Sequence, residues 1–110
     1  MNHLNSIILE GNVKSRRYEV IDGLAYAFIE ITSKRVVKKD DKNVTIKSVF
    51  NARATGVVAD IMKRNATVGR GIRIVGRLAE ADSNVYVFVE HAEFKVKKAK
   101  KNSKIPKECF

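Results

Sequence analysis

The stretch GRGIRIVGRL, at residues 69–78, has an apolar face and a basic face. Successive side chains of a β-strand point to opposite sides of the sheet. A strand here would therefore bury Ile72 and Ile74 and turn Arg73 and Arg77 outward. The stretch predicts a strand with one face in a hydrophobic core and the other face available to a negatively charged partner.

Four other segments show the alternation that predicts β-strands. Together with residues 71–81, the predicted strands are LNSIILEGNV (4–13), LAYAFIEITSKRVV (24–37), VTIKSVFNARA (44–54) and VYVFVEHAEFKV (85–96). The Asp22-Gly23 pair predicts a two-residue hairpin turn. Residues 38–43 predict a charged loop, and residues 82–84 predict a tight polar turn. Gly11 lies on the apolar face of the first strand, which indicates a close approach of two backbones.

The segment TGVVADIMKRN, at residues 55–65, has a different period. Its apolar residues are spaced i, i+1, i+4, i+5, which predicts a short helix, and Thr55 is positioned to cap its start. These apolar residues are Val57, Val58, Ile61 and Met62.

Three strands, a short helix and two more strands predict an all-β fold. The predicted architecture is a five-stranded OB-fold barrel with the helix between strands 3 and 4. We assign residues 1–96 to this domain and residues 97–110 to a basic, flexible C-terminal tail.

The charge of the chain indicates a polyanionic partner. Its 110 residues suit one domain and include 22 Lys and Arg against 12 Asp and Glu, for a net charge of +10. Nucleic acid is the first partner that such an excess indicates, while an anionic membrane surface and a generally basic surface are the alternatives.

The only cysteine is Cys109, and a single cysteine is typical of a protein in a reducing compartment. No apolar stretch suits a signal peptide or a membrane span, so we expect a cytoplasmic protein that does not enter a membrane.

No constellation of residues indicates catalysis. His3 and His91 lie far apart in the sequence, and there is no cysteine pair, phosphate-binding loop, nucleophile elbow or metal-ligand spacing. The sequence therefore predicts a protein that is not an enzyme and that has no cofactor and no metal site.

Three motifs, in the right order, resemble bacterial single-stranded DNA-binding proteins. The segment NSIILEGNV (5–13) is similar to the first strand of that family, in which an asparagine precedes aliphatic residues and a glycine. The end of GRGIRIVGRL is similar to the family's fourth strand, which closes on Gly-Arg-Leu, and FVEHAEF (88–94) resembles the end of its domain. The resemblance implies an OB-fold that binds single-stranded DNA without sequence preference in replication, recombination and repair. It also implies a nucleoid-associated homodimer or homotetramer.

The sequence also departs from this family. It has no tryptophan, and a placement without gaps puts Val49 and Thr55 where two base-stacking aromatic residues fall in the family. The loop between the last two strands is reduced to residues 82–84, and Lys104 and Lys107 stand where the family's tail is acidic. If the remaining aromatic rings are buried, binding would depend mainly on charge. We infer no recruitment of other enzymes through the tail.

Proteins that bind single strands without sequence preference combine a basic groove with aromatic rings on which bases stack. The candidate basic residues follow the first strand, end the second, and lie on the third and fourth. The candidate site comprises Lys14, Arg16, Arg17, Lys34, Arg35, Lys47, Arg53, Arg73 and Arg77, with Tyr26 and Tyr86 as stacking platforms. The alternative for the basic residues is a solvated strand face. The alternative for the aromatic rings is burial by packing under the helix or in a subunit interface. We expect such packing for Phe28, Phe50, Phe88 and Phe94.

Two other functions fit the same fold. An accessory protein similar to primosomal replication protein B would also be short, lack an acidic tail and depend more on lysine than on stacking. It would form a dimer and bind a replication helicase. An OB-fold protein-interaction module that has lost DNA binding would account for the missing tryptophans. The predicted partners are thus single-stranded DNA, further copies of the chain, and replication or repair proteins.

Overall fold

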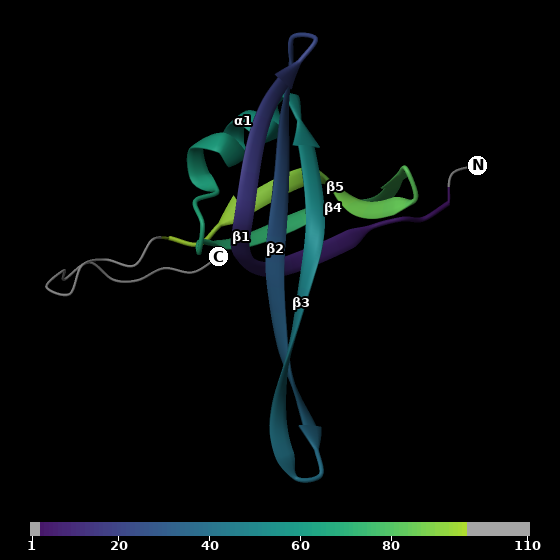
Figure 1. The fold of residues 1–110 in the computed structure, drawn as a ribbon, viewed down its shortest axis with the longest axis vertical. Helices are drawn as coiled ribbons and strands as arrows, with labels where there is room; N and C mark the ends of the chain where they lie inside the picture. Colours follow the sequence, from purple (N-terminus) through teal and green to yellow (C-terminus); the bar gives the residue numbers. More distant parts are fainter. Residues whose placement is uncertain (1–2, 97–110) are drawn as a thin grey trace, which may run out of the picture.

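Five strands and one helix form a closed barrel. The computed structural model describes residues 3–96. The elements are β1 (Ile7–Ile21), β2 (Leu24–Lys39), β3 (Lys42–Thr55), α1 (Gly56–Asn65), β4 (Gly71–Ala81) and β5 (Asn84–Phe94). The strand order is β1-β2-β3-β5-β4, and β4 pairs again with β1 (Figure 1). The predicted OB-fold topology is confirmed, whereas the predicted tail lies outside the described residues.

The apolar faces predicted from the alternation fill the barrel. Ile29 and Ile31 of β2 are buried against Ile72 and Ile74 of β4 in one cluster. The other buried members of the cluster are Val13, Ala27, Ala52, Ala54, Ala59, Met62, Ala66, Val87 and Val89. Gly11 makes the close approach that the sequence predicts, because a Cβ atom there would lie 2.2 Å from the carbonyl oxygen of Thr32. The core therefore fixes which side chains point outward on every strand.

The first strand is longer than the sequence predicts. The pattern predicts an end at residue 13, but β1 continues to Ile21. A bulge between Val13 and Ser15 lets the same strand leave its partner β4 and pair with β2. Such bulges bend a strand and increase its twist, which helps to close a barrel. As a result, Lys14, Arg16 and Arg17 lie within β1 and do not follow it.

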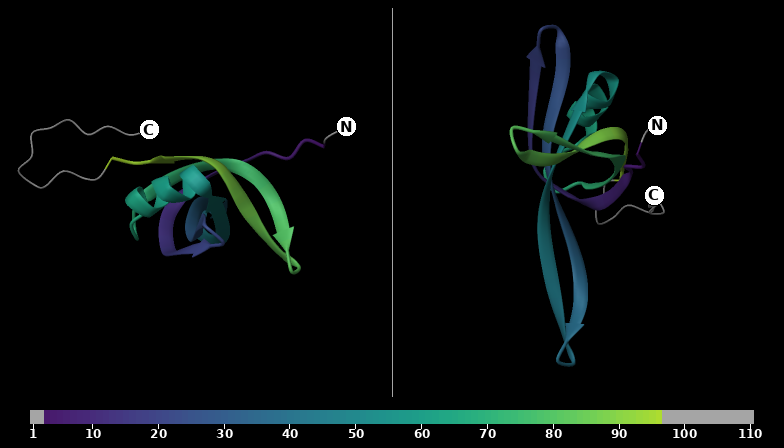
Figure 2. Two further views of the ribbon diagram at one scale, coloured as in Figure 1. Left: turned by 90° about the horizontal axis from the view of Figure 1, so that it is seen from above. Right: turned by 90° about the vertical axis from the view of Figure 1, so that its right-hand side faces the viewer.

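The predicted charged loop at residues 38–43 is wrong. Strands β2 and β3 pair as far as Lys39 and Lys42, so that only Asp40 and Asp41 form the turn. Both aspartates have positive φ angles, 51° and 62°, as the two-residue turns that match strand twist require. The outer half of this hairpin extends beyond the barrel as a two-stranded ribbon, residues 33–48, which we call the arm (Figure 1, Figure 2).

The helix α1 packs against β2, β3 and β5. Its buried residues are Ala59 and Met62, whereas Val57 is 74% exposed, so the predicted apolar face is rotated. Thr55 occupies the capping position that the sequence predicts, but its side chain makes no capping hydrogen bond. Among the described residues, no helix has the length and apolar character needed to cross a membrane.

Candidate nucleic-acid interface

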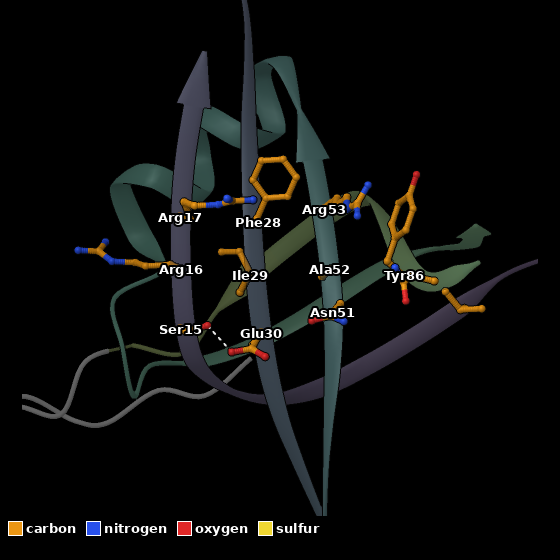
Figure 3. A pocket seen from close by; sticks show the side chains of 12 residues that line it. Ser15, Arg16, Arg17, Phe28, Ile29, Glu30, Asn51, Ala52, Arg53 and Tyr86 are labelled. Atoms are coloured by element: carbon orange, nitrogen blue, oxygen red, sulfur yellow. Dashed lines mark hydrogen bonds between the residues drawn. The ribbon is translucent and has the colours of Figure 1, made fainter. Parts of the chain in front are cut away.

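An open groove lies over the outer face of β1, β2 and β3 and reaches the tip of the β4–β5 hairpin (Figure 3). Its volume is about 510 Å³. Most of the residues that line it come from the middle of β1, β2 and β3, and the rest come from the start of β5. The full set of lining residues is Ser15, Arg16, Arg17, Phe28, Ile29, Glu30, Asn51, Ala52, Arg53, Asn84, Val85 and Tyr86.

Arginine and phenylalanine side chains alternate across the floor of this groove. Arg17 of β1 is paired with Phe28 of β2, which is paired with Arg53 of β3. Cross-strand partners point to the same side of a sheet. The Cζ atoms of Arg17 and Arg53 lie 4.4 Å and 5.5 Å from the centroid of the Phe28 ring, close enough for cation–π attraction. We call Arg17, Phe28 and Arg53 the upper rung.

Two tyrosines extend the aromatic surface of the upper rung. The Tyr26 and Phe28 rings are 6.1 Å apart between centroids and nearly parallel, with an interplanar angle of 8°. On the opposite side, the Cζ atom of Arg53 lies 4.2 Å from the centroid of the Tyr86 ring. Strands β2 and β5 thus contribute rings to one surface, and the guanidinium group of Arg53 of β3 lies between Phe28 and Tyr86.

A second row of side chains lies beside the upper rung. Ser15 of β1 is paired with Glu30 of β2, which is paired with Asn51 of β3. The Ser15 hydroxyl donates a hydrogen bond to Glu30 Oε1 at 2.6 Å (Figure 3). These three residues, which we call the lower rung, are two positions along each strand from the upper rung, or about 7 Å. The groove floor therefore places hydrogen-bonding groups next to a charged aromatic surface.

The arm carries two of the predicted basic residues, and one of them, Lys34, lines a separate hollow beside Glu10 and Asn12. Lys34 and Lys47 are cross-strand partners, and each is an even number of residues from the groove residue of its own strand, Phe28 or Arg53. Like charges placed directly opposite each other destabilise a sheet, so this pair favours an anion nearby. Arg35 is paired with Ile46 on the other face of the arm.

The two predicted arginines of β4 lie outside the groove in ion pairs. Arg73 approaches Glu10 and Glu93, with N–O distances of 3.6 Å and 3.5 Å. Arg77 bonds Glu90 at 2.6 Å. A neighbouring carboxylate offsets the attraction of an arginine for a phosphate, so these two positions have less positive potential than the sequence alone indicates.

Arg16 lies on the opposite side of β1 from Arg17. Its side chain extends away from the Phe28 ring in Figure 3, and its guanidinium donates to the carbonyl oxygen of Ala66 at 3.4 Å. The neighbouring Tyr18 hydroxyl donates to the Met62 carbonyl oxygen at 2.8 Å. Burial raises the pKa of the Tyr18 phenol, although the Arg16 guanidinium acts in the opposite direction. These two residues thus join β1 to the helix region.

The structure brings four predicted site residues together, two in the upper rung and two tyrosines beside it, and separates the others. The four are Arg17, Tyr26, Arg53 and Tyr86. Lys34 and Lys47 lie on the arm, Lys14 is an exposed residue at the β1 bulge, and Arg16, Arg35, Arg73 and Arg77 point elsewhere. Sequence reasoning missed Phe28, Glu30 and Asn51 as groove residues. In the part of the chain that the structure describes, no group of His, Cys, Asp and Glu side chains could hold a metal ion.

A closed five-stranded barrel with a helix between the third and fourth strands defines the chain as an OB-fold protein. No protein-family model and no curated protein sequence matches it. Several solved structures match the chain. PriB from Ralstonia solanacearum has a TM-score of 0.71 at 15% identity, covering 84% of this chain and 98% of that one.

Solved structures of single-stranded DNA-binding proteins are about as similar to this chain as PriB is. The Plasmodium falciparum SSB in complex with single-stranded DNA has a TM-score of 0.75 at 14% identity, covering 86% of this chain and 96% of that one. The small single-stranded DNA-binding protein of Streptomyces coelicolor has a TM-score of 0.66 at 17% identity, covering 87% and 96%. At these identities, the likeness establishes the fold.

Proposed function

We propose that this protein binds single-stranded DNA in the groove, without strict sequence selectivity, during replication, recombination and repair in the cytoplasm. The observation that carries the proposal is the upper rung, where two arginines flank the Phe28 ring, together with the Tyr86 ring beside Arg53. Bases stack on such rings at about 1–3 kcal/mol each. Arginine binds phosphate regardless of sequence. The fold that this chain shares with single-stranded DNA-binding proteins supports the same proposal.

Chemical-shift mapping tests where the strand lies. When oligo-dT is added to nitrogen-labelled protein, we expect the largest amide shifts at residues 15–17, 28–30, 51–53 and 84–86, which line the groove. Aromatic ring currents from stacked bases act over short distances, so amides of α1 should change little. Shifts centred on α1, or spread evenly over the barrel, would contradict the proposal.

The arm is expected to add phosphate contacts. Replacing both Lys34 and Lys47 with glutamine should weaken oligo-dT binding and flatten its salt dependence. For single strands, the slope of log K against log salt is about −0.7 for each neutralised phosphate, so the double variant should lose roughly 1.4 from its magnitude. Fluorescence anisotropy at four or more salt concentrations measures this slope.

A matched control for the arm variant is available on the helix. Lys63 and Arg64 lie in the last turn of α1 and do not line the groove, and their replacement with glutamine changes the net charge equally. This control should keep nearly the parental slope. Equal slopes for both double variants would show that the net charge, and not the arm, determines the salt dependence.

A second candidate is a primosomal accessory role. It is favoured by the likeness to Ralstonia solanacearum PriB, of which this chain covers 98%. This role would add a protein contact to single-strand binding. Capture of a replicative helicase by the purified protein, in the presence and absence of oligo-dT, separates it from DNA coating alone.

We also propose that the protein is a homo-oligomer, a dimer or tetramer. Ile8 of β1 is 71% exposed and is paired with Val75 on the outer face of the barrel. Replacing Ile8 with lysine should lower the mass measured by light scattering, because a second copy would otherwise cover this apolar pair. The matched Val57→Lys change, at a residue of α1 that is 74% exposed, should leave the mass unchanged. A single-chain mass for the parent protein would refute the oligomer.

A further inference from the structure

The lower rung places a carboxylate in the floor of a basic groove. Glu30 is the only acidic residue among the described residues that line the groove. Its one hydrogen-bond partner within residues 3–96 is the Ser15 hydroxyl, and it forms no ion pair there with Arg17 or Arg53. A carboxylate in this place repels a phosphate backbone. Binding of the backbone therefore does not explain why Glu30 lies in the floor of the groove.

The position of Glu30 instead suits the edge of a base. Glu30 and Phe28 are two residues apart on β2 and both point into the groove, about 7 Å apart along the strand. A base stacked on the Phe28 ring can therefore direct its hydrogen-bonding edge toward the lower rung. Figure 3 shows the Glu30 carboxylate and Asn51 side by side below that ring.

Asn51 adds the complementary group. It is the cross-strand partner of Glu30, it is exposed, and its side-chain amide makes no hydrogen bond with the described residues. Because no such hydrogen bond holds it, the Asn51 amide can rotate to present its N–H donors beside the two acceptor oxygens of the carboxylate. The lower rung thus presents two acceptors next to one donor.

This pattern matches guanine best among the four bases. The pairing edge of guanine has two adjacent donors, N1–H and the 2-amino group, followed by the O6 acceptor. Thymine has only one donor between two acceptors that would face the carboxylate. Adenine and cytosine each have a single amino donor beside an acceptor nitrogen. We infer that Glu30 and Asn51 give the groove a preference for guanine at the base stacked on Phe28. This inference rests on the proposed function.

Substituted oligonucleotides test the preference with the unaltered protein. An oligomer of alternating thymine and guanine, in lithium salt to suppress quadruplexes, should bind at least about fivefold more tightly than oligo-dT of equal length. Exchange of guanine for hypoxanthine removes only the 2-amino group and should remove much of that gain. Equal affinity for all three oligomers, or a full gain with hypoxanthine, would overturn the inference.

Variants then assign the preference to Glu30. Glu30→Gln keeps an oxygen that can accept the Ser15 hydrogen bond but removes the paired acceptors. It should lose the guanine preference and bind oligo-dT more tightly than the parent, because the carboxylate that repels the phosphate backbone is gone. Asp60→Asn makes the same charge change on the exposed surface of α1 and should keep the preference. A preference that survives in Glu30→Gln would overturn the inference. Failure of every oligomer to bind would instead refute the proposed function, and the inference with it.

Discussion

Replacing Gly76 with valine is expected to abolish cooperative folding of the barrel. A Cβ atom at this buried position would lie 2.0 Å from the carbonyl oxygen of Phe88 and 2.9 Å from its carbonyl carbon. Both are backbone atoms of the neighbouring strand, so they can move only if β4 and β5 separate. The cost should exceed about 4 kcal/mol, the range of exceptional substitutions. The whole stability of such a domain is about 5–15 kcal/mol. Thermal unfolding followed by circular dichroism measures the loss.

A nearby substitution provides the control for Gly76. Ile74 is fully buried on the same strand, and its change to valine removes one methylene group without a clash. This variant should lose only about 0.5–1.5 kcal/mol and keep a cooperative transition. A Gly76→Val protein that unfolds at the parental temperature would show that β4 and β5 do not approach as closely as described.

Replacing Phe28 with alanine is expected to have the largest effect on DNA binding of any single groove substitution. The ring carries a stacking surface shared with Tyr26 and lies between the guanidinium groups of Arg17 and Arg53. Its loss removes about 1–3 kcal/mol of stacking, which corresponds to roughly a 5- to 150-fold weaker affinity for oligo-dT. The two arginines would also lose the ring that positions them. Fluorescence titration at one fixed salt concentration measures the change.

Phe50 provides the matched control for Phe28. It lies on the opposite face of β3 from Asn51 and Arg53 and is 42% exposed. The Phe50→Ala change removes the same ring from a place outside the groove, so the affinity should stay within about twofold of the parent. Equal losses for the two variants would indicate that ring burial and stability, not stacking, cause the effect.

The upper rung could have been predicted from the hairpin turns. In a two-residue hairpin, pairing can be counted outward from the turn, so Asp22-Gly23 places Arg17 opposite Phe28. The turn at Asp40 and Asp41 places Phe28 opposite Arg53 by the same counting. Reading residues 38–43 as a loop hid this second register. Alternation along β2 places Phe28 opposite the core face but does not reveal the two arginines beside it.

Other parts of the site depend on contacts that local patterns do not contain. Strands β3 and β5 pair in parallel through Ala52–Val87 and Arg53–Phe88, which brings Tyr86 to the groove across a long sequence separation. The bulge between Val75 and Gly76 changes which side of β5 faces outward, and this places Glu90 beside Arg77. Alternation along a single strand cannot reveal such a carboxylate. The outward direction of Arg73 and Arg77 was predicted, but their ion pairs were not.

The most direct test of the account is a titration of fluorescent oligo-dT of about 35 nucleotides, longer than the site of one OB-fold. A duplex of equal length serves as the control, and both are measured at several salt concentrations. We expect sub-micromolar binding to the single strand, weakened by salt and much tighter than binding to the duplex, because only unpaired bases can reach the rings of Phe28 and Tyr86. Weak binding of equal strength to the single strand and the duplex, abolished entirely by salt, would contradict single-strand binding in the groove. Such a result would show only the general attraction of DNA to a basic surface.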